Sequence, residues 1–477
     1  MWMAFPPLGW GPLAFIAPAP FLWAVRRCER GTTALAVGLT FGGIFFGLLL
    51  SWIFVLGAVA WIPLTLFMAA FAAVYALGIW SLRLWPSGRW WIVAVGGWGL
   101  WEWVRAHFPF GGFPWGSVGF AAGGSPGVIG SVQWIGPTGW SILAVGVAAG
   151  LVLLIEDVKD WHFIVDTGVV VLLLAMGGSI LGPQPAGEEI AVAIIQGGSP
   201  CPMTRCQNEN LRIFQRHLDL TRTVTAGSVD LVVWPENSTG TPYEPEGNEE
   251  VRAAITAEAE RIGAYMLISG TRRSGASGFV NVNVVFSPEG RKIGEYAKRH
   301  PVPFGEYVPF RGLLSFIPQL ERVPRDMVRG TEAVVFRMDQ GVLGSVISFE
   351  GAFARSIRAE AVKGAELLVV ATNESSYGDD AAASDQLIGM TRVNAAAVGL
   401  DLVHAAITGK STFISADGEV GAVVELGETG VLQGTVRFRD GAKTLYTIAG
   451  DWLLYLTLIV AAAAMVVPGG RPEPSPG

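Results

Sequence analysis

Charged residues, cysteine and histidine are all scarce in this sequence. Only 15% of its 477 residues are Asp, Glu, Lys or Arg, and the net charge of −7 is spread along the chain without a basic block. That pattern excludes nucleic acid as a partner. Three cysteines are too few for a disulfide scaffold, and neither they nor the five histidines have the spacing of a metal site. We therefore expect no metal and no cofactor.

One pair of cysteines leaves two interpretations open. Cys201 and Cys206 are close in sequence and can form one small disulfide if their segment faces an oxidising compartment. Two free thiols are an equally good interpretation. The third cysteine, Cys28, lies far from both along the chain.

Apolar residues dominate the composition instead. Hydrophobic residues make up 51% of the chain, and 18 tryptophans are present, which is typical of a membrane protein. Nearly continuous apolar segments predict membrane spans at residues 10–25, 34–56, 59–83, 89–106, 138–155, 162–182 and 447–467. The opening MWMAFPP resembles the tail of a further helix, which gives seven to eight spans. Within the fourth span, Glu102 and Arg105 predict an intramembrane pair with a structural role.

The distribution of Lys and Arg predicts how the spans are oriented. RRCERG at 26–31 and the turn at 83–89 carry the positive charge and are expected in the cytoplasm. The loop at 107–124 has no Lys or Arg and is expected outside. Alternation of the spans then places residues 186–440 outside the cytoplasm and the closing RPEPSPG inside.

Residues 186–440 have the pattern of a compact α/β domain. Runs of strand length such as EIAVAIIQ and ELLVVATNE alternate with amphipathic helical segments such as NEEVRAAITAEAERIGA. A domain built this way has a buried sheet. We therefore predict a transmembrane helix bundle at 1–185, the α/β domain at 186–440, and a C-terminal transmembrane helix with a short cytoplasmic tail at 441–477.

Three polar residues stand at the ends of apolar strands in this domain. Glu236 ends LVVWPE, Lys298 lies in EYAKRH, and Ser348 follows VLGSVI. A carboxylate base, an ammonium group and a nucleophile are the parts that covalent acyl transfer requires, because the base removes the nucleophile's proton and the cation stabilises the oxyanion. Each residue alone is more often structural or solvated, so residue type does not by itself join them into one site.

The segments around these residues do join them. Trp-Pro-Glu at 234–236, YAKRHPVPFGEYVPF at 296–310 and Ser-Phe-Glu at 348–350, in that order, resemble the nitrilase superfamily. Together with WEWVRAHFPFGGFPWGSVGF at 101–120 and the membrane spans, they resemble the apolipoprotein N-acyltransferase family over nearly the whole chain. TNESSYG at 372–378 is similar to the actinobacterial branch of that family.

The resemblance implies a nitrilase-like αββα sandwich joined to the helix bundle, in a bacterial inner membrane. Members of the family move an acyl chain from a phospholipid to the α-amino group of the diacylglyceryl-cysteine that begins a lipoprotein. Their steps are ping-pong and pass through a thioester on the enzyme. The implied partners are therefore a phospholipid donor, a lipoprotein acceptor and the bilayer.

The resemblance also implies roles for individual residues. By their places in the motifs, Glu236 is the general base, Lys298 the oxyanion stabiliser and Ser348 the nucleophile. Glu306 and Glu350 are implied as supporting carboxylates that orient Lys298 or the incoming amine. Contacts with substrate are implied for three further residues: Tyr307, Phe349 and Ser376.

Ser348 departs from the family, which has a cysteine at this position. A cysteine thiol has a pKa of about 8.5 and is intrinsically nucleophilic, whereas a serine hydroxyl must be deprotonated as it attacks. Three interpretations stay open: a hydroxyl nucleophile in a slow enzyme, an engineered Cys→Ser change that stalls catalysis, and a natural relative that binds lipid or lipoprotein without acylating. Ser376 is a smaller departure, because many relatives have Trp there.

Two rival functions remain from the sequence. One is a membrane-tethered amidase acting on a small soluble substrate. Seven or eight spans are many more than such an enzyme needs to be anchored, which counts against it. A catalytically silent lipid or lipoprotein binder is the other, and Ser348 favours it. In the enzyme interpretation, the segment at 301–320 is rich in Gly, Pro and aromatic residues. It is a candidate lid over an opening between bundle and domain.

Overall fold

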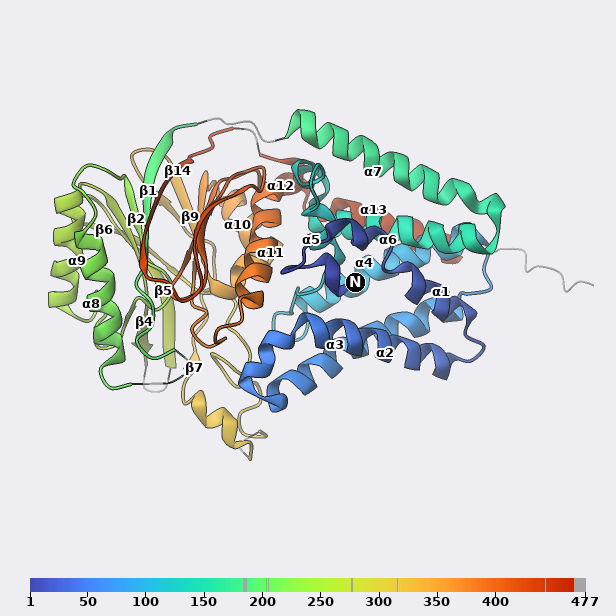
Figure 1. The fold of residues 1–477 in the computed structure, drawn as a ribbon, viewed down its shortest axis with the longest axis horizontal. Helices are drawn as coiled ribbons and strands as arrows, with labels where there is room; N and C mark the ends of the chain where they lie inside the picture. Colours follow the sequence, from blue (N-terminus) through green and yellow to red (C-terminus); the bar gives the residue numbers. More distant parts are fainter. Residues whose placement is uncertain are drawn as a thin grey trace, which may run out of the picture.

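The chain folds into a helix bundle and an α/β domain that lie side by side (Figure 1). This computed structural model describes residues 1–182, 187–202, 204, 206–275, 278–314, 316–441 and 443–466. The last helix returns from the domain to the bundle. The predicted class, a membrane helix bundle with a nitrilase-like α/β domain, is confirmed. The predicted division at 185/186 and the closing RPEPSPG fall outside the described residues.

The bundle contains helices from both ends of the chain. Its helices are α1 (Ala19–Arg27), α2 (Gly31–Leu49), α3 (Ala58–Ser81), α4 (Ser87–His107), α5 (Val118–Gly123), α6 (Val132–Glu156), α7 (Trp161–Leu181), α12 (Leu445–Ala449) and α13 (Trp452–Val466). Among the described residues, four helical stretches are long and apolar enough to cross a membrane, and they contain α2, α3, α6 and α7. α13, with 15 residues, is apolar but shorter.

The first predicted span is not one helix. Residues 10–25 form a short 3₁₀ helix, η2 (Gly11–Phe15), followed by α1. Pro12, Pro18 and Pro20 interrupt the segment, and proline cannot supply the amide hydrogen that a continuous helix needs. By contrast, α2 and α3 pack closely along their length, because Gly38 and Gly42 leave no room for a side chain against α3.

The loops predicted to be cytoplasmic meet at the end of the bundle that lies away from the α/β domain (Figure 1). Arg26 forms an ion pair of 2.7 Å with Glu156, and the Ser87 hydroxyl donates to Asp160 at 2.5 Å. These contacts join the loops after α1, before α4 and after α6. The basic residues of these three loops therefore lie at one end of the bundle.

The α/β domain contains two sheets with helices on their outer faces. The first sheet has the order β14-β1-β2-β4-β5-β6, with β3 and β7 attached to β4 and β5. Its strands are β1 (Glu189–Gln196), β2 (Leu231–Val233), β3 (Thr239–Gly240), β4 (Tyr265–Ser274), β5 (Gly278–Phe286), β6 (Lys292–Ala297), β7 (Asp326–Met327) and β14 (Gly430–Arg437). Helices α8 (Glu209–Arg222) and α9 (Glu249–Ile262) cover it.

The second sheet lies on the bundle side of the domain (Figure 1). Its order is β13-β12-β11-β10-β9-β8. The strands are β8 (Val335–Arg337), β9 (Val342–Ile347), β10 (Leu367–Thr372), β11 (Leu402–Ala406), β12 (Ser411–Ile414) and β13 (Val420–Val424). Helices α10 (Ala354–Lys363) and α11 (Ala382–Val398) cover its outer face.

Of the three apolar clusters that involve the domain, one lies between the first sheet and helices α8 and α9, and the other two explain how the sheets are joined to each other and to the bundle. One of these two fills the space between the sheets and includes Ile194, Leu267 and Val369. The other large cluster runs without a break from the bundle into α10 and α11, where Ile357 and Leu387 belong to it. The bundle and the second sheet are therefore packed as one body, and a shift of one is felt by the other.

Parallel pairing brings functional loops to one edge. β9 and β10 run parallel, as do β10 and β11, and β2 runs parallel to both β1 and β4. The carboxyl ends of parallel neighbours meet at the same edge of a sheet. The residues that follow β2 and β9, which include Glu236 and Ser348, therefore lie at corresponding edges of the two facing sheets.

Candidate active site

Lys298 lies between two carboxylates in the interior of the domain. Its Nζ is 3.2 Å from Oε1 of Glu236 and 2.6 Å from Oε1 of Glu306. Lys298 is 1% exposed and Glu236 is 3% exposed. Glu306 is fixed on its other side, because its Oε2 accepts a hydrogen bond of 2.7 Å from the Val302 amide. The structure thus brings together three of the residues that the sequence singled out.

Ser348 completes this group from the second sheet. It is the first residue after β9, and it lies close enough to Glu236 to lower the pKa of that carboxyl. Its φ of 56° lies in the left-handed region, which costs a non-glycine residue of order 1–3 kcal/mol. Strain of this kind persists where the surrounding structure enforces it, and it is common at catalytic sites. The turn holds Ser348 beside Glu236.

Asn281 is a site residue that the sequence interpretation missed. Its Nδ2 donates to Oε1 of Glu236 at 2.6 Å, and its backbone oxygen accepts from the Lys298 amide at 2.9 Å. It therefore holds both members of the pair. A signal was present in the sequence, since the run VNVNVVF is apolar apart from two asparagines, and an asparagine needs a polar partner when it is buried.

The charges within the group shift the pKa of each member. Burial raises the pKa of Glu236, the Lys298 ammonium lowers it, and Glu306 raises it again, so the balance is a raised pKa. Burial lowers the pKa of Lys298, but Glu236 and Glu306 outweigh burial and the balance is again a raised pKa. Lys298 therefore stays an ammonium ion, and Glu236 is a carboxylate with more than ordinary affinity for a proton.

Glu350 connects the Lys298 segment to the Ser348 turn. Its Oε1 accepts from the amides of Arg299 and His300 at 2.8 and 3.0 Å. Its Oε2 accepts from the Tyr296 hydroxyl at 2.7 Å and from the Ile347 amide at 2.9 Å. Although burial raises the pKa of Glu350, hydrogen bonds from His300, Ile347 and Tyr296 hold it below its ordinary value. Glu350 therefore holds the backbone beside Lys298 through its hydrogen bonds, and its charge also helps to raise the pKa of Lys298.

We expect Glu350→Gln to destabilise the domain. An amide presents an NH₂ group where Oε1 or Oε2 now accepts, so at least one buried donor loses its acceptor. The free energy of unfolding should fall by about 2–3 kcal/mol. Thermal unfolding in detergent measures this, with Glu332→Gln as the control because that side chain is exposed and only weakly paired. An unfolding temperature equal to that of the control would contradict the role given to Glu350.

The bundle contributes an aromatic wall beside Ser348. The Phe349 ring stacks on Trp115 with 5.4 Å between centroids and on Phe113 with 5.8 Å. Both of these residues come from the loop between α4 and α5. Phe353 closes the other side in an edge-on contact of 4.8 Å with Phe349. Phe349 therefore lies among aromatic rings, and its contact with substrate stays a prediction.

Glu102 and Arg105 do not form the ion pair with each other that the sequence predicted. Instead, Oε1 of Glu102 accepts from the Val118 amide at 2.9 Å, while Arg105 donates to the Phe113 oxygen at 2.9 Å and to Ser117 at 3.0 Å. The loop from α4 folds back over both side chains and offers closer partners than either offers the other. The pair has a structural role, since it holds the loop that carries the aromatic wall.

The remaining predicted contacts differ in how close they lie to this group. Tyr307 directly follows Glu306 and is half-buried. Ser376 is exposed. Its neighbour Tyr377 packs its ring edge-on against Trp52 at 4.8 Å, and burial is the main cause of its raised pKa. The sequence interpretation missed Tyr377, because the departure from the family lies at the residue before it, Ser376.

Glu374 is a second buried carboxylate near the group that the sequence did not single out. Burial, together with the charge of Glu236, raises its pKa to about 7, although hydrogen bonds from Ser384 and Thr372 lower it. It follows β10, the strand beside the one that carries Ser348. The edge of the second sheet therefore presents polar residues after two adjacent strands.

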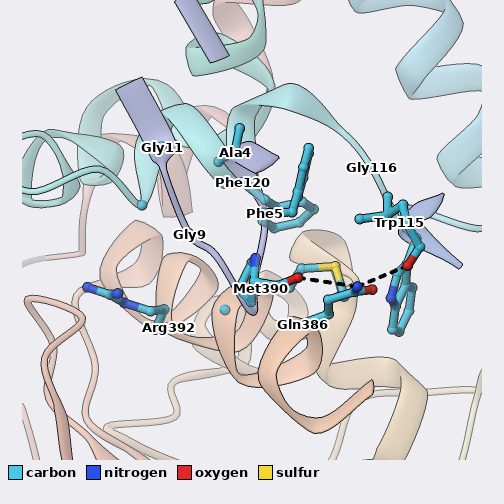
Figure 2. Close-up of a pocket in the computed structure, with 15 residues that line it drawn as sticks. Ala4, Phe5, Gly9, Gly11, Trp115, Gly116, Phe120, Gln386, Met390 and Arg392 are labelled. Carbon is cyan, nitrogen blue, oxygen red and sulfur yellow. Dashed lines mark hydrogen bonds between the residues drawn. The ribbon is translucent and has the colours of Figure 1, made fainter. Parts of the chain in front are cut away.

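A small cavity lies where the bundle meets α11. Its volume is about 70 Å³, and Figure 2 shows it between Phe5 and Phe120 of the bundle and Met390 of α11. Gln386 closes one side by donating to the Leu49 oxygen at 3.0 Å. None of the three candidate catalytic residues lines this cavity. It is a packing gap at the junction, separated from Ser348 by the aromatic wall.

The structure shows how the cysteines are paired and whether side chains gather that could bind a metal. Cys201 and Cys206 form a disulfide, which resolves the alternatives left by the sequence. Within the described ranges, no group of three or more His, Cys, Asp or Glu side chains could hold a metal ion.

Comparisons with protein families match both parts of the chain. Residues 1–150 match the model of the apolipoprotein N-acyltransferase N-terminal domain. Residues 191–445 match the model of the carbon-nitrogen hydrolase.

Individual relatives match over nearly the full length. A protein of Geobacter metallireducens called apolipoprotein N-acyltransferase is 30% identical, over 97% of this chain and 92% of the relative. One of the same name from Gloeobacter violaceus is 26% identical, over 98% and 92%. Among solved structures, an amidase double mutant from Nesterenkonia sp. AN1 in complex with acrylamide covers 58% of this chain and 100% of its own. Its identity is 17% and the TM-score is 0.43.

Proposed function

This chain belongs to the apolipoprotein N-acyltransferase family, and we propose that it transfers an acyl chain from a phospholipid to the α-amino group of the diacylglyceryl-cysteine that begins a lipoprotein. The observation that carries the proposal is the arrangement of Glu236, Lys298 and Ser348 at the facing edges of two sheets, beside an aromatic wall supplied by the membrane bundle.

In the first step, the Ser348 hydroxyl attacks the ester carbonyl of the phospholipid. Glu236 takes the hydroxyl proton as the new C–O bond forms, and the carbonyl oxygen becomes an oxyanion beside the Lys298 ammonium. The amide of Phe349, the residue after the nucleophile, is placed to be a second donor. When the bond to the glycerol oxygen breaks, Glu236 returns the proton to that oxygen. The products are a lysophospholipid and an ester on Ser348.

In the second step, the amine of the lipoprotein attacks the ester on Ser348. Glu236 takes the proton that the nitrogen loses and gives it to the Ser348 oxygen as the C–O bond breaks. The products are an amide on the lipoprotein and the original hydroxyl. A raised pKa suits Glu236 to both transfers, because a general base is most effective when its pKa approaches the working pH.

The apolar surface around the site fits a donor that arrives from the bilayer. The described part of the 301–320 segment exposes four large apolar side chains: Phe304, Phe310, Leu313 and Phe316. Phe310 meets Phe110 of the bundle loop at 5.9 Å between ring centroids. Soluble domains rarely expose apolar side chains in such a group. We propose that this segment contacts the outer leaflet and covers the site, as the sequence predicted for a lid.

Two observations support an extracytoplasmic position of the domain in a bacterial inner membrane. The basic loops gather at the far end of the bundle, and positive loops favour the cytoplasm. The Cys201–Cys206 disulfide belongs to the domain, and disulfides persist in oxidising compartments. We retain the division into a bundle at 1–185, a domain at 186–440 and a final helix at 441–477 as part of this proposal.

Mass spectrometry of the purified protein after incubation with phosphatidylethanolamine vesicles tests the function. We expect an acyl adduct on Ser348 that disappears when a diacylglyceryl-cysteine peptide is added, with the acyl group recovered on the peptide amine. Ser348→Ala is the control and should take up no acyl group. Absence of the adduct in the unmodified chain and in Ser348→Cys would overturn the transferase proposal. Binding of lipid without an adduct would then favour the silent binder.

The pH dependence of acyl-enzyme formation should report the raised pKa of Glu236. The base must be ionised, so the rate should fall as the pH drops through that pKa, with a midpoint above the ordinary glutamate value of about 4.3. Glu306→Gln removes a charge that raises the pKa, so the midpoint should move to lower pH. The exposed control Glu332→Gln should leave it in place. A midpoint that Glu306→Gln does not move would show that another group limits the rate.

A further inference from the structure

A second hollow opens at the rim of the first sheet, next to the catalytic group. Its volume is about 330 Å³, and the residues that line it include Arg272, Arg273, Phe279, Gly305 and Arg325. Neither the proposed mechanism nor the aromatic wall uses it.

The hollow continues from the catalytic group along the same face of the sheet. Side chains alternate along a strand, so Phe279 and Asn281 of β5 share a face. The register pairs Asn281 with Thr271 and Phe279 with Arg273. The hollow therefore begins one residue pair, about 7 Å, beyond the asparagine that holds Glu236.

The loop that carries Glu306 forms the boundary between the hollow and the catalytic group. Gly305 lines the hollow, and Glu306 directly after it contacts the Lys298 ammonium at 2.6 Å. The Glu306 oxygen also accepts from the Met327 amide at 2.8 Å, which ties this loop to β7. A group bound in the hollow thus touches the residue that precedes Glu306, the carboxylate in contact with Lys298.

The hollow presents positive charge that none of the described residues pairs with. Arg273 and Arg325 are exposed, and among the described residues neither has a hydrogen-bond or ion-pair partner. Arg272 is different, since it pairs with Glu295. Two free guanidinium groups present planar sets of donors that suit carboxylates and carbonyl oxygens.

The hollow and the aromatic wall are built by different parts of the protein. It belongs to the sheet that α8 and α9 cover, whereas the bundle packs against α10 and α11 on the other sheet (Figure 1). The aromatic wall of Phe349 and Trp115 stands on the bundle side. The two surfaces beside the catalytic group therefore differ in chemistry, one being apolar and formed with the bundle, and the other being cationic and formed by the first sheet and the loops next to it.

We propose that this hollow binds the peptide that follows the acylated cysteine of the lipoprotein, with a preference for acidic side chains. The inference rests on the proposed function and assigns a part of the acceptor to a part of the site. The acceptor lipids stay with the bilayer, so the peptide is the substrate portion that extends away from it. An extended chain advances about 3.3 Å per residue, so residues two to four after the amine reach the arginines.

The test uses diacylglyceryl-cysteine peptides with Asp, Asn or Lys at positions two to four. The full-length protein in detergent is first acylated on Ser348, and transfer to each peptide is then followed. We expect the chain to have its lowest KM for the Asp peptide. In Arg273→Gln/Arg325→Gln, that KM should rise about fivefold to tenfold while the KM for the Asn peptide changes less than twofold, as expected for two exposed charge contacts.

The same experiment contains its controls. Formation of the acyl-enzyme from phospholipid should be unchanged in the double variant, because the donor does not enter the hollow. Arg291→Gln removes another exposed positive charge elsewhere on the domain and should leave all three KM values in place. Equal effects on the Asp and Asn peptides, no effect on either, or a slower acylation step would each overturn the proposal.

The experiment distinguishes a failure of the proposed acyltransferase function from a failure of the proposed peptide binding in the hollow. If no acyl-enzyme forms, binding of fluorescent Asp and Asn peptides to Ser348→Ala still measures the hollow, with and without the two arginine changes. An Asp preference that disappears in the double variant would support the hollow by itself. A binding ratio of one in both proteins would overturn it, whatever the chemistry at Ser348.

Discussion

Glu236→Gln should lower the rate of acyl-enzyme formation by about 10³-fold, which is within the range of general-base contributions. The substitution keeps the shape of the side chain, and its oxygen can still accept from Asn281 and from Lys298. What it removes is the ability to accept the Ser348 proton. Single-turnover acylation from phosphatidylethanolamine measures the effect, because this step is separate from any contact with the acceptor.

The control for this prediction is Glu244→Gln, a buried carboxylate in the same segment that accepts from the Glu246 amide. It should leave the rate within about twofold and show that loss of a local hydrogen-bond acceptor is not the cause. Retention of more than a tenth of the rate in Glu236→Gln would mean that another group takes the proton. Glu374 is then a candidate, because its pKa of about 7 also suits a base.

The main features of the fold and the three candidate catalytic residues could be predicted from the sequence, but for different reasons. Apolar runs of span length and strand-length runs alternating with amphipathic helices have few other physical solutions, so the class followed from periodicity. Glu236, Lys298 and Ser348 each stand at the end of an apolar strand, where a polar side chain needs an explanation. Their proximity came only from the family resemblance, since nothing local in the sequence encodes which strands meet.

What the sequence could not provide depends on register and on loop paths. Asn281 reaches Glu236 because β4 and β5 pair in one particular register, and the same register places Arg273 beside Phe279. A change of one residue would have turned these side chains to the other face. Likewise, Glu102 and Arg105 are spaced to pair, but the loop after α4 folds back and competes successfully for both.

The second large effect concerns the nucleophile itself. Ser348→Cys should increase the rate of acyl-enzyme formation by about 10²-fold or more, because a thiol near a cation ionises far more readily than a hydroxyl. The turn that holds residue 348 at positive φ and the nearby Lys298 ammonium stay unchanged. Ser376→Cys is the matched control, since it places an exposed thiol close in sequence but without a buried lysine beside it. It should acquire no acyl group.

Combining the two changes separates the roles of the residues. In the Ser348 background the base must remove a proton during attack, whereas in Ser348→Cys the thiolate forms beforehand and Lys298 stabilises it. Glu236→Gln should therefore cost clearly less in the cysteine background, about 10-fold instead of 10³-fold, and the two substitutions should be strongly non-additive. Equal losses in both backgrounds would indicate that Glu236 serves by holding Lys298 in place. No gain from Ser348→Cys alone would mean that residue 348 does not attack the donor.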